Sequence, residues 1–108
     1  MTTERTAPVL YLVIPCYNEE AVLPETTKRL TEKLHTMIRT GLIDRESRIL
    51  YVDDGSRDQT WSLISEYSAA IPYVDGVKLA HNRGHQNALL AGLMTAAPLC
   101  DCAISMDA

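Results

Sequence analysis

The sequence predicts an α/β fold in which helices flank a parallel, Rossmann-like sheet. Continuous apolar runs rich in β-branched residues, such as VLYLVIP at 9–15, are typical of strands buried on both faces. These runs alternate with segments whose apolar residues recur at helical spacing. Strands that alternate with helices favour parallel pairing through right-handed crossovers. The 108 residues therefore suit one small domain built from three strand–helix units and a last strand.

The first half of the chain accounts for two strands and two helices. Residues 1–8 are expected to be a flexible N-terminus. The expected elements are a strand at 9–15 ended by Pro15, a helix near 21–40 stopped by Gly41, a strand at 47–53, and a helix capped by Asp58 or Thr60 that ends near Ala70. The run of Leu23, Leu30 and Leu34 gives the first of these helices its apolar side.

The second half continues the alternation. It predicts a short strand at 75–80, a small-residue helix at 87–97 and a buried strand at 102–107. Because a natural domain seldom ends directly after a buried strand, residues 9–108 are expected to be the front part of a longer domain. The open sheet edge that truncation leaves predicts self-association into a homo-oligomer.

Composition narrows the functional classes. The net charge of −4 argues against binding to nucleic acid, which relies on a basic surface. The three cysteines form no CxxC pair, which favours reduced thiols in a cytoplasmic protein. No apolar stretch approaches the roughly 20 residues of a membrane span, and no signal-peptide pattern is present.

Polar side chains gather where the predicted strands end. In parallel α/β sheets, ligands bind outside the carboxyl ends of the strands, which selects the loops at 15–20, 53–58 and 80–86 and the residues from 107 on. These loops carry Tyr17, Asn18, Glu19, Glu20, Asp53, Asp54, Ser56, Arg57, Asp58, His81, Asn82, Arg83, His85, Gln86 and Asp107. The mixture suits an anionic ligand with a planar ring and a divalent cation.

Four of these residues have a specific chemical use. A nucleotide ring can stack on Tyr17. The carboxylate of Asp54 can accept a hydrogen bond from the imide N–H of a pyrimidine. Asp107 is a hard oxygen ligand of the type that Mg²⁺ or Mn²⁺ prefers beside phosphate oxygens. Arg83 can neutralise a phosphate.

Other residues have plainer explanations. Glu20 precedes a helix, where acids favour the macrodipole. Asp58 suits a helix cap, and Asp53 suits a brace across its turn. His81 and His85 suit ordinary loop positions. The sequence contains no GxGxxG after the first strand, no GxxxxGK[ST] and no GxSxG, which argues against dinucleotide oxidoreductases, P-loop NTPases and α/β-hydrolases.

Four motifs in order, VIPCYNEE, YVDDGSRDQT, NRGHQNALLAGL and ISMDA, give the chain a family resemblance. From about Val9 to Ala108 it resembles family 2 glycosyltransferases of the GT-A fold, most of all the polyprenyl- and dolichyl-phosphate hexose synthases. The resemblance implies that this chain is the N-terminal nucleotide-binding half of that fold. It implies a nucleotide pocket lined by Pro15, Tyr17 and Glu19, in which Val52 and Asp54 contact the base.

The same resemblance implies a reaction. A hexose passes from a nucleotide sugar, UDP-linked rather than GDP-linked, to a polyprenyl phosphate or glycan acceptor with inversion, and Mg²⁺ or Mn²⁺ assists. Asp107 and Ala108 match the first two positions of the family's Asp-x-Asp metal motif. The remaining ligand and the catalytic residues are expected beyond residue 108, so the fragment alone is expected to be inactive. Members of the subgroup often carry C-terminal membrane segments, which implies a place at the cytoplasmic face of the membrane.

Three other classes of protein are alternatives. A receiver domain needs its acidic pair after the first strand, whereas this pair follows the second. A nucleotidyltransferase opens with a Gly-rich loop, and PCYNEE has no glycine. A non-catalytic nucleotide-binding domain is compatible with the same residues and stays open.

Overall fold

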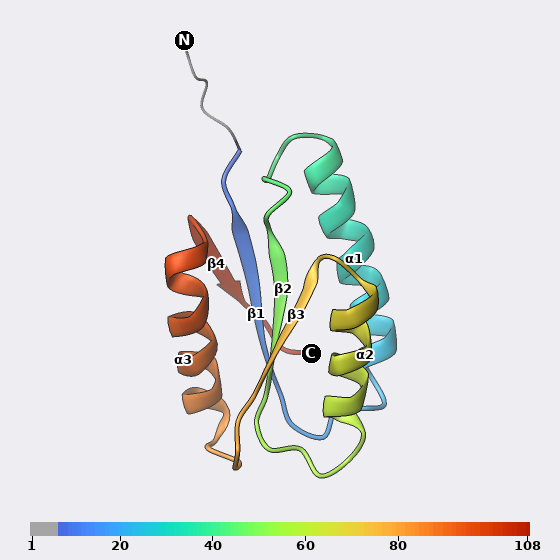
Figure 1. Ribbon diagram of the computed structural model, residues 1–108, viewed down its shortest axis with the longest axis vertical. Coiled ribbons are helices and arrows are strands. Elements are labelled where there is room, and N and C mark those ends of the chain that lie inside the picture. Colours follow the sequence, from blue (N-terminus) through green and yellow to red (C-terminus); the bar gives the residue numbers. More distant parts are fainter. Residues whose placement is uncertain (1–6) are drawn as a thin grey trace.

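The chain forms one four-stranded sheet with helices on both faces (Figure 1). The computed structural model describes residues 7–108. Its elements are β1 (Leu10–Cys16), α1 (Leu23–Arg39), β2 (Arg48–Asp53), α2 (Thr60–Ala70), β3 (Val74–Lys78), α3 (His85–Ala96), the 3₁₀ helix η1 (Ala97–Leu99) and β4 (Cys102–Ser105). All pairings are parallel, in the order β3-β2-β1-β4. The predicted α/β class and parallel sheet are confirmed; most of the expected N-terminus, 1–6, lies outside the described residues.

The central strands β1 and β2 are buried from both sides. On one face, Ile14 and Tyr51 pack with Leu34 of α1 and Ile64 of α2. Among residues 7–108, α3 is the helix that covers the other face (Figure 1). Each fully buried aliphatic side chain contributes roughly 1.5–3 kcal/mol, so these two layers supply most of the driving force.

The close packing of α3 on the sheet depends on its small residues. A Cβ atom placed on Gly92 would lie 2.5 Å from Cγ1 of Val13 and 2.7 Å from Cγ2 of Val52. Ala88 and Ala96, each about one helical turn from Gly92 on the same side of α3, are fully buried. The prediction that this helix approaches the sheet closely is confirmed.

The prediction that Pro15 ends the first strand is wrong. β1 runs through Cys16, and its register pairs Pro15 with Val52 and Cys16 with Asp53. β4 pairs with β1 only as far as Val13. Pro15 therefore lies where β1 has a neighbour on one side only, and a missing N–H is tolerated at such an edge.

The first helix is shorter than its apolar pattern suggested. α1 begins at Leu23, with Pro24 in its first turn. At its other end the amide of Gly41 donates to the carbonyl of Ile38, and the amide of Leu42 to that of Met37. With a φ of 84° at Gly41, this is a Schellman motif, which confirms the glycine as the stop.

The prediction of a buried last strand is wrong. All four residues of β4 are exposed, and Ile104 keeps 52% of its surface. β4 is an edge strand, and no other strand within residues 7–108 pairs with its second side. An apolar sequence run reports what a strand could bury, but burial requires a neighbouring element.

Candidate functional site

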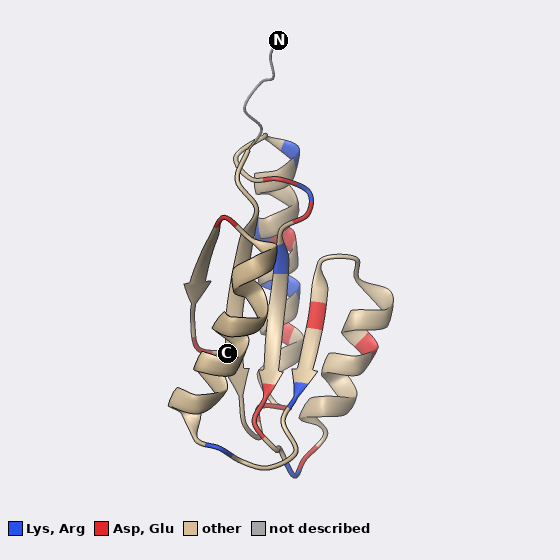
Figure 2. Cartoon of the chain, turned by 60° about the vertical axis from the view of Figure 1, so that its left-hand side comes forward, with Lys and Arg blue, Asp and Glu red and all other residues tan. Residues whose placement is uncertain are grey.

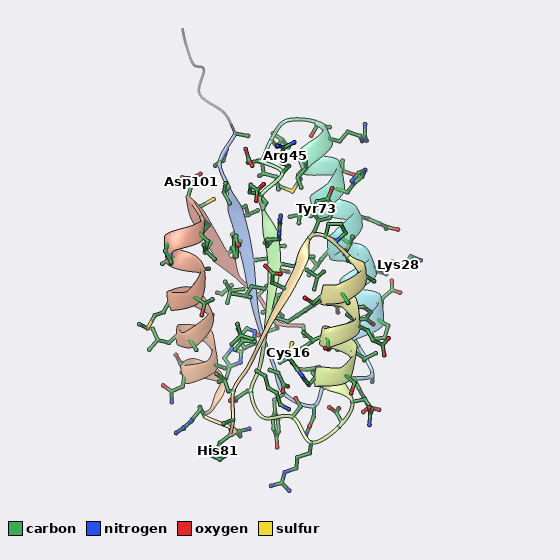
Figure 3. All side chains as sticks on the ribbon, viewed as in Figure 1. Cys16, Lys28, Arg45, Tyr73, His81 and Asp101 are labelled. Carbon is green, nitrogen blue, oxygen red and sulfur yellow. The ribbon has the colours of Figure 1, made fainter. Side chains whose placement is uncertain are left out.

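A cavity of about 250 Å³ lies at the carboxyl ends of the strands. The lining residues come from all four predicted loops and are Pro15, Cys16, Tyr17, Glu19, Asp54, Asn82, Gly84, His85, Asp107 and Ala108. Charged residues lie in the loops beyond the strand arrowheads (Figure 2), and the labelled Cys16 and His81 lie toward this end, away from Arg45 and Asp101 (Figure 3). Strand order reverses at β1, so the cavity occupies the switch point of the sheet.

Asp54 connects the end of β2 to the loop before α3. Its carboxylate accepts hydrogen bonds from the amides of Arg83, at 2.7 Å, and Gly84, at 3.1 Å, and the residue is only 3% exposed. Gly55, at φ 73°, allows the close approach, because a Cβ there would lie 2.5 Å from the amide nitrogen of Asn82. An ionised carboxylate has about four acceptor positions, so Asp54 retains acceptor capacity for a ligand.

The loops after β1 and β2 are also joined by side chain–backbone hydrogen bonds. The amide of Glu19 donates to Oγ1 of Thr60 at 2.8 Å, and Oε1 of Glu20 accepts from the amide of Gln59 at 2.8 Å. Asp58 accepts from the amide and the hydroxyl of Thr60. Partial burial raises the pKa of Asp58, but its hydrogen bonds with Thr60 and Glu20 outweigh this and hold the pKa below its usual value. Glu20 and Asp58 thus bind protein backbone.

The other acid of the pair, Asp53, is fully buried. Its Oδ1 accepts a long hydrogen bond, 3.4 Å, from the amide of Ser56, in line with the predicted brace across the turn. Its Oδ2 has no hydrogen-bond partner among residues 7–108. Beside it, burial and the charges of Glu19 and Asp53 raise the pKa of the Cys16 thiol to about 12. Cys16 is therefore a neutral thiol at physiological pH and a poor nucleophile or metal ligand.

Asp107, in the segment after β4, also lines the cavity. Its carboxylate Oδ1 is 3.8 Å from Nε2 of His85, and its side chain is 91% exposed. Within residues 7–108, no three His, Cys, Asp or Glu side chains converge on one point. A single carboxylate fits an ion of the Mg²⁺ type, which is commonly held by one or two carboxylates and by substrate phosphates.

Five of the seven predicted site residues meet at the cavity: Pro15, Tyr17, Glu19, Asp54 and Asp107. Val52 is buried beneath α3, and Arg83 is exposed and reaches the site through its backbone amide. Of the other lining residues, Asn82 and His85 were placed in the strand-end loops without an assigned role, and Cys16, Gly84 and Ala108 were not selected for the site. The signal that could have found Cys16, Gly84 and Ala108 is their position within or beside the strand-end segments that this rule selects.

Parallel strands with a cavity at the point where their order reverses define an α/β protein of the doubly wound type with a candidate site at its strand ends. The chain belongs to glycosyl transferase family 2, whose sequence model matches residues 11–108. Membership of this family argues against the receiver and nucleotidyltransferase alternatives and confirms the resemblance seen in the four motifs.

Curated relatives support the same family. The chain is 51% identical over 105 residues to an uncharacterised glycosyltransferase, YkoT, of Bacillus subtilis (strain 168), covering 97% of this chain and 31% of YkoT. It is 40% identical over 83 residues to the undecaprenyl-phosphate 4-deoxy-4-formamido-L-arabinose transferase of Shewanella sediminis (strain HAW-EB3), covering 75% of this chain and 23% of that enzyme. The chain thus spans less than a third of either relative.

A solved structure supports the fold. The mannosyltransferase PcManGT of Pyrobaculum calidifontis, solved in complex with GDP-Man and Mn²⁺, aligns with a TM-score of 0.61 at 24% identity. The alignment covers 83% of this chain and 25% of that chain.

None of the helices within residues 7–108 has the length and apolar character needed to cross a membrane.

Proposed function

We propose that residues 9–108 are the nucleotide-sugar-binding part of a glycosyltransferase that transfers a hexose to a polyprenyl phosphate or glycan acceptor. The convergence of Tyr17, Glu19, Asp54 and Asp107 on one strand-end cavity carries the proposal. Relatives named as undecaprenyl-phosphate sugar transferases support the lipid-phosphate acceptor. The greater length of the relatives agrees with further acceptor-binding and catalytic groups outside this chain.

The nucleoside would occupy the side of the cavity formed by the loops after β1 and β2. Tyr17, 40% exposed, offers a ring face for stacking of the base. The remaining acceptor positions of Asp54 suit the imide N–H of uracil, which favours a UDP-sugar as the donor. The contact of Val52 with the base and the contact of Arg83 with a phosphate stay predictions for the bound state.

The diphosphate would occupy the side near Asp107, His85 and the start of α3. A Mg²⁺ or Mn²⁺ ion held by Asp107 and diphosphate oxygens would neutralise the charge of the leaving group. The bond from the anomeric carbon to the diphosphate breaks, the leaving group takes the electron pair, and the acceptor oxygen forms the new bond from the opposite side with inversion. A phosphate acceptor is already ionised and needs no strong base.

Calorimetric titration of this chain with uridine, UDP and GDP, with and without Mn²⁺, tests the proposal. We expect UDP to bind more tightly than uridine or GDP. We expect Mn²⁺ to strengthen the binding of the two diphosphates and to leave the binding of uridine unchanged. Tyr17→Ala should weaken UDP binding, whereas the matched control Tyr17→Phe keeps the ring and should bind normally. Equal, metal-independent binding of all ligands would contradict the site, and sugar transfer by this chain alone would contradict the expected division of labour.

A further inference from the structure

Asn18 combines an unusual backbone conformation with a position between two cavity residues. Its φ of 52° makes it the one non-glycine residue within 7–108 in the left-handed region. Tyr17 and Glu19 line the cavity, but Asn18 does not. A left-handed residue is strained and persists only where its surroundings hold it in place. Asparagine bears this conformation better than most residues.

Two hydrogen bonds hold this residue against the next loop. The amide of Asn18 donates to Oγ of Ser56 at 2.9 Å, and Oδ1 of Asn18 accepts from the amide of Arg57 at 2.9 Å. These partners are 38 and 39 residues away in the chain. A change of φ at Asn18 would rotate the peptide planes on either side of it, so the same bonds govern the directions of Tyr17 and Glu19.

We infer that Asn18 is a positioning residue for the nucleotide pocket, and that it acts through Tyr17 and Glu19 without touching the ligand. The left-handed turn directs both neighbours to the cavity, and the bonds with Ser56 and Arg57 keep the turn in that conformation. This inference rests on the proposed nucleotide site. It gives the Asn of the motif CYNEE a function that neither its exposure nor its absence from the cavity wall suggests.

Three substitutions separate the two properties of Asn18. Asn18→Ala loses both the acceptor and the tolerance of positive φ, Asn18→Gly loses only the acceptor, and Asn18→Asp keeps both. We expect the Kd for UDP to rise about tenfold in Asn18→Ala, less in Asn18→Gly, and little in Asn18→Asp. Titrations at moderate salt screen the charge that the Asp variant adds. Ser56→Ala removes the other bond and provides a second route to the same effect.

A double-mutant cycle with Tyr17→Ala distinguishes positioning from a structural role. If Asn18 acts mainly through Tyr17, Asn18→Ala should weaken UDP binding much less in the Tyr17→Ala background. Urea titration ensures that Kd values are compared among folded proteins. Additive losses, or an unchanged Kd in both Asn18→Ala and Ser56→Ala while the parent chain binds UDP, would overturn this inference alone. A parent chain that does not bind UDP would overturn the proposed function and this inference with it.

Discussion

The two sides of the strand-end cavity are built differently. On one side, the loops after β1, β2 and β3 are joined by the carboxylates of Asp54, Glu20 and Asp58 and by the hydroxyl of Thr60. On the other side, the segment after β4 contributes Asp107, whose side chain is 91% exposed and 3.8 Å from His85. We call these the joined side and the open side.

The difference indicates which interactions are ready before a ligand arrives. Groups fixed by hydrogen bonds lose little conformational freedom when a ligand binds, so the joined side suits recognition of a rigid base. An exposed carboxylate keeps its hydration and its rotamers until a cation and phosphates organise it. The comparison predicts large stability effects from changes at the joined side and small ones at the open side.

The largest loss of stability is expected for Gly55→Ala. The added Cβ would meet the backbone of Asn82 at 2.5 Å, and φ is 73°. Overpacking and left-handed strain together should lower the free energy of unfolding by roughly 4 kcal/mol in urea titration. Gly41→Ala is the matched control, because Gly41 has a φ of 84° but nothing within 4 Å of an added Cβ. Equal losses in the two variants would show that the loop contact is unimportant.

The second-largest loss of stability is expected at alkaline pH, from the buried groups at this end of the sheet. The Cys16 thiol ionises near its ordinary pKa of 9.0 when unfolded but near 12 when folded, so the unfolded state releases its proton first. Stability should therefore be unaffected by this group below pH 9 and fall by up to about 1.4 kcal/mol per pH unit between pH 9 and 12. Tyr51, whose folded pKa is raised to about 12 chiefly by burial, adds to the fall above pH 10.

Cys16→Ala provides the control for this pH dependence, because it removes the thiol and should flatten the decline between pH 9 and 10. Thiol labelling of the native protein at pH 8 gives an independent check: exposed Cys102 should react fast and buried Cys16 slowly. Equal labelling rates would contradict the assigned burial.

Asp54→Asn is expected to have an intermediate effect. The amide side chain can accept a hydrogen bond from only one of the Arg83 and Gly84 amides, and its NH₂ group faces the other donor. We expect a loss of about 2 kcal/mol in the free energy of unfolding, together with weaker UDP binding in calorimetry. Unchanged stability would show that Asp54 does not hold the loop before α3.

Asp107→Asn should have the smallest effect on stability, below about 0.5 kcal/mol, because the carboxylate is exposed. Its effect should appear only with ligand: the strengthening of UDP binding by Mn²⁺ should disappear, while binding of uridine stays the same. A large change in unfolding free energy would mean that the open side is already organised without ligand.

Several parts of the fold and site were predictable because they depend on local patterns. Apolar runs and helical spacing identified every strand and α-helix within residues 7–108, although most boundaries shifted by one or two residues. The strand-end rule located the cavity loops. Pro15 and β4 were mispredicted because strand termination and burial depend on which neighbours a strand has, and those neighbours come from distant parts of the chain.

The sequence by itself determined the element order, the parallel sheet, the family and five of the residues that line the cavity. The tertiary structure decided what each residue bonds to. Asp54 holds the loop at 83–84, Glu20 and Asp58 bind backbone, and His85 lies beside Asp107. Apart from the contact between Asp58 and Thr60, these contacts join residues that lie 22 to 39 positions apart in the chain. Sequence periodicity reports local geometry, whereas a hydrogen bond between two loops depends on the sheet that brings them together.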